Sequence, residues 1–141
     1  MNSIENATAN ETDPTLSPEL QLTGLIKELG AANKEIVLFS LASTDGFNIK
    51  TVSVKGLDVE SDKLAAMSSS MFALGNSSSE QLMKCESTII TIESENGNYF
   101  LVKAEFKGKP CVISMVAKSS MQLAQARFHL KKITQAIAEI S

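Results

Sequence analysis

The spacing of hydrophobic and polar residues along this chain predicts three helices and five strands. Apolar residues recur every three or four positions over about 18–30, 62–75 (with a possible resumption at 79–83) and 119–140, which is typical of amphipathic helices. Short runs rich in β-branched and aromatic residues predict strands at 36–42, 47–54, 87–93, 99–106 and 110–117. We therefore expect an α+β fold in the order α-β-β-α-β-β-β-α, with helices covering a five-stranded antiparallel sheet around one core.

Glycine-containing turns separate the predicted strands. Asp45-Gly46 and Asn96-Gly97 are strong signals for two-residue hairpin turns, and Lys107-Gly108-Lys109 predicts a third turn. In the second strand the apolar positions slip by one residue, which predicts a bulge near Lys50-Thr51. The three last strands should therefore form an antiparallel meander.

The helix predicted at 62–75 has two stripes of residues at helical spacing. The larger residues are predicted to face the core: Leu64, Met67, Met71 and Leu74. The second stripe consists of small residues: Ala66, Ser70, Ala73 and Ser77. A row of small residues allows another backbone to approach closely, but plain solvent exposure explains it equally well. The sequence alone leaves both interpretations open.

The N-terminal residues differ in composition from the rest of the chain. Residues 1–17 are polar and lack the apolar residues that a core needs, so they are predicted to be a disordered tail before a folded domain at 18–141. Ser17 and Pro18 are suited to the N-cap and the first position of the first helix, and Gly30 to its end.

Charge and hydropathy exclude several function classes. The net charge is −3, and removal of the acidic tail leaves 13 acidic and 13 basic residues, so the folded part lacks the basic surface expected of a nucleic-acid-binding protein. No apolar run approaches the roughly 20 residues of a membrane span, and the N-terminus has no secretory signal pattern. We therefore expect a cytoplasmic protein.

Residues that could carry chemistry are few and scattered. Cys85 and Cys111 lie far apart and are predicted to be buried or half-buried structural thiols. His129, the only histidine, lies off the buried stripe of the last helix and is expected to be solvated or cap-like. The alternating acids Asp58, Glu60 and Asp62 could bind a cation weakly, but solvated acids before a helix explain them better. No nucleotide-binding or nucleophile motif is present, so we expect neither an enzyme nor a cofactor.

The order of these elements resembles the Roadblock family of dynein light-chain-like proteins, including its bacterial members. Ser43-Thr44-Asp45-Gly46-Phe47, after an apolar strand, is similar to the family's first hairpin. Leu64-Ala65-Ala66-Met67-Ser68 is similar to the start of its next helix, and the meander and last helix follow in the same order. The resemblance covers about residues 22–140. The N-terminal tail and the serine-rich segments 68–70 and 76–79 depart from the family pattern.

Membership in this family would imply a Roadblock/profilin-like sandwich that forms a homodimer or a mixed complex. In the family the second helices pack side by side and the third strands pair, so that one sheet runs through both subunits. Transferred to this chain, these elements give the interface candidates Ala66, Ser70, Ala73, Thr88, Ile90 and Ile92. Pairing would also protect an exposed β-branched strand from aggregation.

The resemblance also implies a function through protein–protein interaction. It implies a bacterial, non-enzymatic regulator or scaffold that binds a small Ras-like GTPase. In relatives of the Mgl type, such a dimer stimulates hydrolysis by acting on the switch segments of the GTPase. The alternative is a small-molecule sensing domain of the PAS or GAF type, which also places helices on an antiparallel sheet and requires a ligand cavity.

Overall fold

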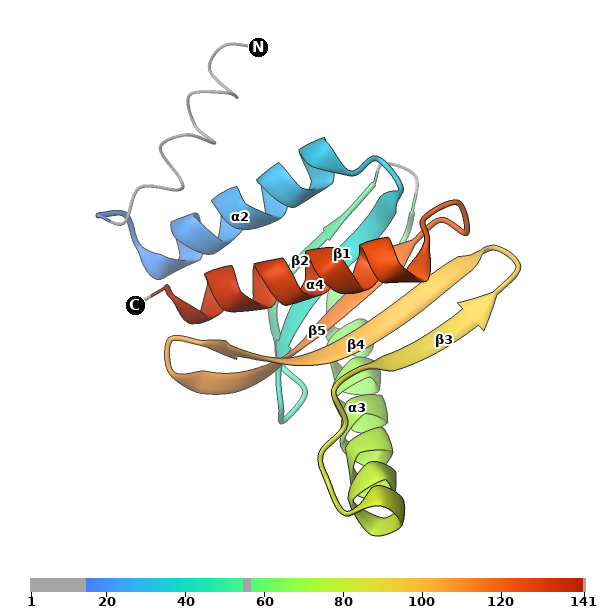
Figure 1. The fold of residues 1–141 in the computed structure, drawn as a ribbon. Coiled ribbons are helices and arrows are strands. Elements are labelled where there is room, and N and C mark those ends of the chain that lie inside the picture. The colour runs from blue at the N-terminus through green and yellow to red at the C-terminus, as the bar shows by residue number, and fades with distance from the viewer. Residues whose placement is uncertain (1–14, 55–56, 141) are drawn as a thin grey trace.

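A five-stranded antiparallel sheet with helices on both faces forms the protein (Figure 1). The computed structural model describes residues 15–54 and 57–140. With the labels of Figure 1, the elements are α2 (Pro18–Ala32), β1 (Ile36–Ser43), β2 (Asn48–Ser53), α3 (Ser61–Met83), β3 (Ile90–Ser94), β4 (Gly97–Phe106), β5 (Lys109–Ala117) and α4 (Leu123–Ala138). The predicted class and element order are confirmed. The predicted tail lies largely outside the described residues.

The strands follow the spatial order β2-β1-β5-β4-β3, and every neighbouring pair is antiparallel. β5 is the central strand and has β1 and β4 on either side. β1 and β5 are buried on both faces of the sheet, which explains why both are almost continuously apolar. β2 and β3 are the two edges. Each edge strand has one strand partner within this chain.

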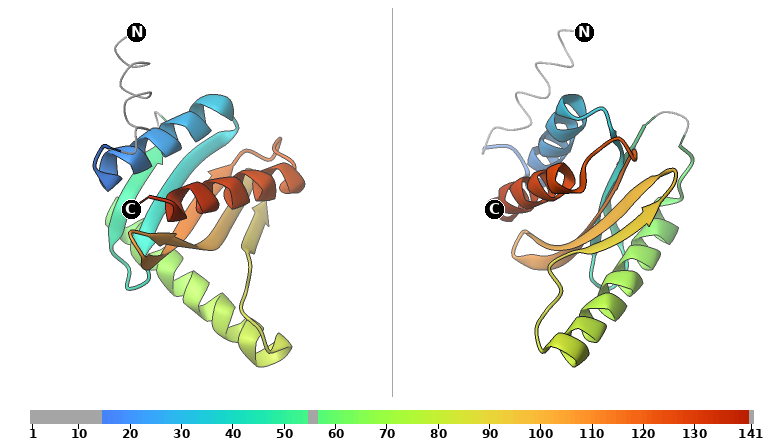
Figure 2. Two further views of the ribbon diagram at one scale, coloured as in Figure 1. Left: turned by 60° about the vertical axis from the view of Figure 1, so that its left-hand side comes forward. Right: turned by 45° about the vertical axis from the view of Figure 1, so that its right-hand side comes forward.

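Helices α2 and α4 lie side by side on one face of the sheet, and α3 lies on the other (Figures 1 and 2). The main core fills the space between the sheet and the α2–α4 pair. Nineteen buried residues form it, including Leu22, Ile26, Phe39, Leu41, Phe100, Met115, Leu130 and Ile137. The buried face predicted for the last helix is confirmed at Ala126, Leu130, Ile133, Ile137 and Ile140, whereas Leu123 is only partly buried.

The first hairpin has a longer turn than its sequence predicts. Ser43 N–H donates to the carbonyl of Phe47 (2.9 Å), so the residue pair that closes the hairpin encloses three residues, Thr44, Asp45 and Gly46, and not two. Within this loop only Gly46 has a positive φ, +94°. The register shift lies at Ile49, one residue before the predicted bulge, because Leu41 pairs with Lys50 and Ala42 with Asn48.

The other two hairpins differ in the position of their glycine. Lys107 and Gly108 both have positive φ, +54° and +73°, and form the two-residue turn between β4 and β5. Between β3 and β4 the turn residues are Glu95 and Asn96, and Gly97 is already the first residue of β4. A side chain at Gly97 would place its Cβ 2.6 Å from the carbonyl oxygen of Ala117, so this position requires glycine because of close packing.

The ends of α2 follow local hydrogen bonds. Ser17 Oγ accepts from Leu20 N–H (3.3 Å), as expected for the N-cap, and Pro18 occupies the first helical position. The helix continues past the predicted end at Gly30, because the backbone and side-chain amides of Asn33 both donate to the carbonyl of Leu29.

Helix α3 runs without interruption to Met83, so the predicted break at Gly75 is wrong. A Cβ at Gly75 would overlap Cδ1 of Ile90, so the glycine makes room for this side chain from β3. The helix ends at Lys84, which has a left-handed conformation. Its second half extends beyond the sheet (Figure 1), and β3 begins at Ile90, three residues later than predicted.

Candidate protein–protein interface

Helix α3 faces the sheet with four small residues and two large apolar ones. Its buried residues are Leu64, Ala65, Ser68, Ser69, Phe72 and Ser79. The predicted core stripe is therefore wrong in part: Leu64 is buried and Met71 half-buried, but Met67 is 47% exposed and Leu74 72% exposed. Four large apolar side chains of this helix therefore point away from the core of their own chain: Met67, Leu74, Leu82 and Met83.

Serine can replace apolar residues under α3 because each buried hydroxyl has a partner. Ser68 Oγ donates to the carbonyl of Ala65 (3.2 Å), and Ser69 Oγ donates to the carbonyl of Ser43 in β1 (2.8 Å). On the same face of the sheet, Ser40 and Ser114 pair across β1 and β5, and both are buried. Small, hydrogen-bonded residues thus meet on both sides of this contact.

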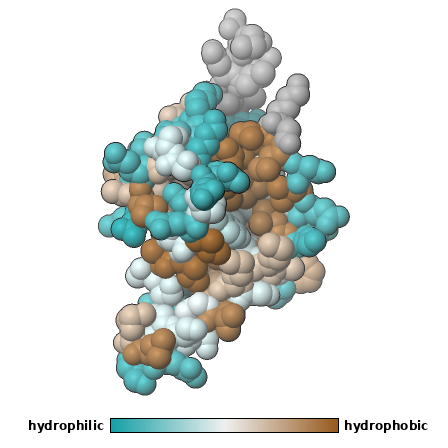
Figure 3. All heavy atoms as spheres, turned by 90° about the vertical axis from the view of Figure 1, so that its right-hand side faces the viewer, coloured by the Kyte–Doolittle hydropathy of each residue, from teal (hydrophilic) through white to brown (hydrophobic). Residues whose placement is uncertain are grey.

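The outward face of α3 combines small and large exposed residues. The small stripe Ala66, Ser70, Ala73 and Ser77 is exposed along its length. Beside it, large apolar side chains reach solvent: Met67, Leu74, Leu82 (80% exposed) and Met83 (67%). Hydrophobic patches are visible on the side of the molecule that carries β3 and on its projecting lower part (Figure 3). We call this face of α3, from Ala66 to Met83, the outer α3 face.

Strand β3 lies next to α3 at the open edge of the sheet. Ile90 pairs with Leu101 and Ile92 with Tyr99, so both isoleucines are on the α3 side of the sheet. Ile90 packs into the space at Gly75, whereas Ile92 is 41% exposed. Thr88 is exposed and precedes the strand. Of the six interface candidates, Ile90 and Ile92 therefore lie in the edge strand, and Ala66, Ser70 and Ala73 lie on the outer α3 face.

A small apolar cluster connects α3 to β4 and β5. Phe72, Leu101 and Val112 are buried in it, with Tyr99 partly buried against them. The hydroxyl of Tyr99 lies 3.3 Å from Ser114 Oγ. Burial raises the pKa of Tyr99 above its usual value near 10, and the Ser114 hydrogen bond offsets part of this rise.

The remaining candidate chemical groups are separate from this surface or isolated. Cys111 is buried as predicted, and loss of hydration raises the pKa of its thiol. Cys85 is exposed, contrary to prediction, because it follows the end of α3 beyond the sheet. His129 is half-buried, so the expectation of a solvated ring is wrong. Its Nε2 is shielded from solvent and has no hydrogen-bond partner among the described residues.

The part of the chain that the structure describes contains neither a group of metal ligands nor a helix that could span a membrane. Over 15–54 and 57–140, no three acidic, histidine or cysteine side chains come together in a group that could hold a metal ion. Within the same ranges, no helix has the length and apolarity required to cross a membrane.

Solved structures share this arrangement over most of its length. An MglB with a tetrameric arrangement superposes with a TM-score of 0.75 and 16% identity, covering 91% of this chain and 96% of that chain. MglB from Myxococcus xanthus gives a TM-score of 0.74 with 13% identity, covering 85% and 94%. A Roadblock/LC7 domain from Streptomyces avermitilis gives 0.69 with 19% identity, covering 80% and 91%. This chain has the Roadblock fold.

The likeness is one of structure. No family model matches the sequence, and no curated protein matches it. The Roadblock fold of this chain leaves two adjacent elements uncovered on the same side of the sheet. These elements are the outer α3 face and the edge of β3.

Proposed function

We propose that the protein is a dimeric, non-enzymatic regulator or scaffold that acts in the bacterial cytoplasm and binds a small Ras-like GTPase. The observation that carries this proposal is the α3 side of the sheet, where the edge of β3 and the outer α3 face are both uncovered. There the open edge of β3 lies beside a helix whose large apolar residues face solvent. Exposed apolar residues concentrated in one region are characteristic of association surfaces.

A two-fold axis beside β3 accounts for the candidate residues. Pairing of β3 with its copy would extend the sheet into a second subunit and satisfy the open backbone groups of both edges. Such an interface uses the same surface twice and is closed. The small stripe Ala66, Ser70 and Ala73 would let the two α3 helices approach closely, and Ile92 would be covered.

The proposed partner follows from the fold and from the resemblance to Mgl-type regulators. A regulator of this kind supplies no catalytic residue, because it can shift the switch segments of the GTPase into a competent geometry. The projecting end of α3 offers Leu74, Leu82 and Met83 as apolar contacts for a partner. The sensing-domain alternative has less support, since the space between the sheet and the α2–α4 pair is filled by the main core.

The dimer is tested with a charge pair on the outer α3 face. Ser70→Arg with Ala73→Glu places long charged side chains where the helices would meet, so the mass measured by light scattering should fall from twice the 15.1 kDa chain mass to a single chain mass. The matched control is Ala124→Arg with Ala138→Glu, two exposed alanines of α4 on the opposite face, and it should remain dimeric. An unchanged mass in the α3 variant refutes this interface.

The GTPase is tested by affinity capture of the tagged protein from its source lysate, with a GTP analogue or with GDP. Recovery of one small GTPase mainly with the analogue supports the regulator and identifies its partner. Equal recovery in both samples supports a scaffold that does not distinguish the nucleotides. Absence of any GTPase from both samples contradicts the proposed partner, whatever the outcome of the dimer test.

A further inference from the structure

Two segments of this chain each carry charged side chains of one sign only, and the two signs are opposite. Residues 1–26 contain Glu5, Glu11, Asp13 and Glu19 and no lysine or arginine. Residues 118–138, which include α4, contain Lys118, Arg127, Lys131 and Lys132 and no acid. The rest of the chain mixes both signs. Charge attraction therefore favours contact between these two segments.

A groove lies along α4 on the face of the sheet opposite α3. Its volume is about 450 Å³, which is within the range of roughly 300–1,000 Å³ found for small-ligand sites. Its lining includes an apolar set, Ile89, Val102 and Leu130, and a basic set, Lys103, Arg127 and Lys131. The apolar set suits a buried side chain, and the basic set suits carboxylates.

The basic residues of this groove are largely uncompensated. Among the described residues, one side chain of the groove forms an ion pair: Lys103 lies 3.8 Å from Glu86. Both of these side chains are mostly exposed. Arg127 and Lys131 are exposed on α4 and form no ion pair there. The groove therefore presents positive charge that an acidic segment can neutralise.

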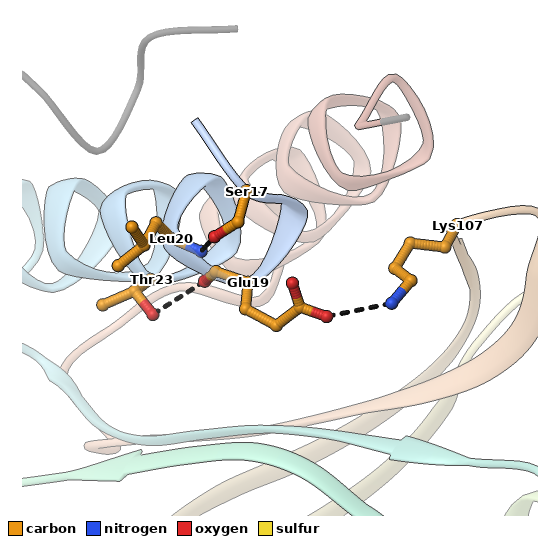
Figure 4. Close-up of polar contacts among 5 residues, drawn as sticks. All are labelled: Ser17, Glu19, Leu20, Thr23 and Lys107. Carbon is orange, nitrogen blue, oxygen red and sulfur yellow. Dashed lines mark hydrogen bonds and ion pairs between the residues drawn. The ribbon is translucent and has the colours of Figure 1, made fainter. Parts of the chain in front are cut away.

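The start of α2 already carries one acidic residue onto a lysine at the end of β4, a strand that also lines the groove. Glu19 Oε1 accepts a hydrogen bond from Lys107 Nζ at 2.9 Å, at the turn between β4 and β5 (Figure 4). This bond is the main cause of the lowered pKa of Glu19. The chain thus enters α2 beside the end of β4, the strand that contributes Val102 and Lys103 to the groove.

The distance from this point to the groove is short compared with the reach of the N-terminal residues. From Lys107 back to Val102 is five residues of β4, or roughly 17 Å at about 3.3–3.4 Å per residue. Fourteen extended residues span up to roughly 46–50 Å. Tethering also gives the segment a local concentration on the order of millimolar at a site within reach, so weak contacts suffice.

We propose that residues 1–14 dock in the groove of their own chain, with the carboxylates of Glu5, Glu11 and Asp13 against Arg127 and Lys131. Ile4, the only large apolar residue of the segment besides Met1, would cover the apolar lining. The contact is predominantly ionic and exposed, so it is weak and can be displaced. The contact does not depend on the proposed GTPase or dimer.

The test uses the full chain with a nitroxide spin label near the middle of the segment. Thr8→Cys in a Cys85→Ser background provides the labelling site, because Cys111 is buried. Amide signals of Ile89, Leu130 and Thr134 should be attenuated at low salt. They should recover at 1 M salt, where the screening length falls to about 3 Å from about 10 Å at 0.1 M. Attenuation that is absent at low salt, or that lies elsewhere on the protein, overturns the proposal.

Two charge-reversal variants separate the groove from general attraction. Arg127→Glu with Lys131→Glu should abolish the attenuation. Lys118→Glu with Lys132→Glu makes the same change in net charge at residues that do not line the groove, and it should preserve the attenuation. Equal loss in both variants overturns the proposal in favour of non-specific attraction.

A mixing experiment distinguishes the chain's own segment from that of a second copy. Isotope-labelled protein without nitroxide is mixed with nitroxide-labelled protein without isotope. Undisturbed groove signals support docking within one chain. Attenuated groove signals in the mixture overturn it, because the segment would then occupy the groove of another copy.

Discussion

The two faces of the sheet differ in how completely one chain covers them. On the α2–α4 face, nineteen buried residues form a continuous core. On the α3 face, the apolar cluster has three buried residues, Phe72, Leu101 and Val112, and the nearby contact is made by hydrogen-bonded serines. In Figure 2, α2 and α4 lie on the first face, and α3 lies on the second and projects beyond the sheet. The first face is complete within one chain, whereas the second leaves apolar residues in solvent.

This difference separates the stability of the chain from its interactions. Burial of apolar surface stabilises the fold, so most of the stabilisation should come from the α2–α4 face. Residues such as Met67, Leu74 and Leu82 add little to an isolated chain because they are not buried in it. Their burial becomes available only when another protein covers the outer α3 face.

The largest expected effect comes from truncating a core residue. Phe100→Ala removes a side chain that is 1% exposed and should lower the free energy of unfolding by about 3–5 kcal/mol. Leu74→Ala, on the other face, should change it by less than about 0.5 kcal/mol. Urea denaturation at low protein concentration measures both. Similar values for the two variants would show that the faces contribute equally, contrary to this comparison.

The sequence predicted the complete face far better than the open one. On α4, residues such as Leu130 and Ile137 recur at helical spacing because the core of the same chain selects them. On α3, the same rule chose Met67 and Leu74, and both are exposed. Hydrophobic spacing shows which residues need to be covered, and it does not show whether the cover belongs to the same chain. Buried Ser68 and Ser69 have no such signal, because their hydroxyls are satisfied only in the folded structure.

Local geometry accounts for the other differences from the sequence predictions. Gly75 resembles a helix end in sequence, but its role depends on Ile90, which is 15 residues away in the chain. The turn after β1 has three residues although its Asp-Gly pair is typical of a two-residue turn. The role of Gly75 depends on a contact between distant segments, and the length of the turn depends on which residues form its closing hydrogen bond. The spacing of apolar residues along the chain contains neither.

A smaller effect is expected from the serine contact under α3. Ser69→Ala removes the hydrogen bond to the carbonyl of Ser43 and should destabilise the protein by about 1 kcal/mol relative to Ser70→Ala. Ser70 is exposed on the same helix, so both substitutions change helix propensity equally and their difference isolates the bond. Urea denaturation of the two variants gives the comparison. Identical stabilities would mean that the hydroxyl is not needed to hold α3 on the sheet.

The smallest effect concerns the shielding of Tyr99 on the open face. As the only tyrosine, it reports its own ionisation in an absorbance titration. Partial burial should place its pKa above 10, and Ser114→Ala should raise the pKa further, because the lost hydrogen bond favours the ionised form. Ser77→Ala, an exposed serine of α3, is the control and should leave it unchanged. Circular dichroism at each pH verifies that the fold persists. A pKa at or below 10 in the folded protein would mean that water reaches the cluster beneath α3 freely, and the open face would then be even less complete than the structure indicates.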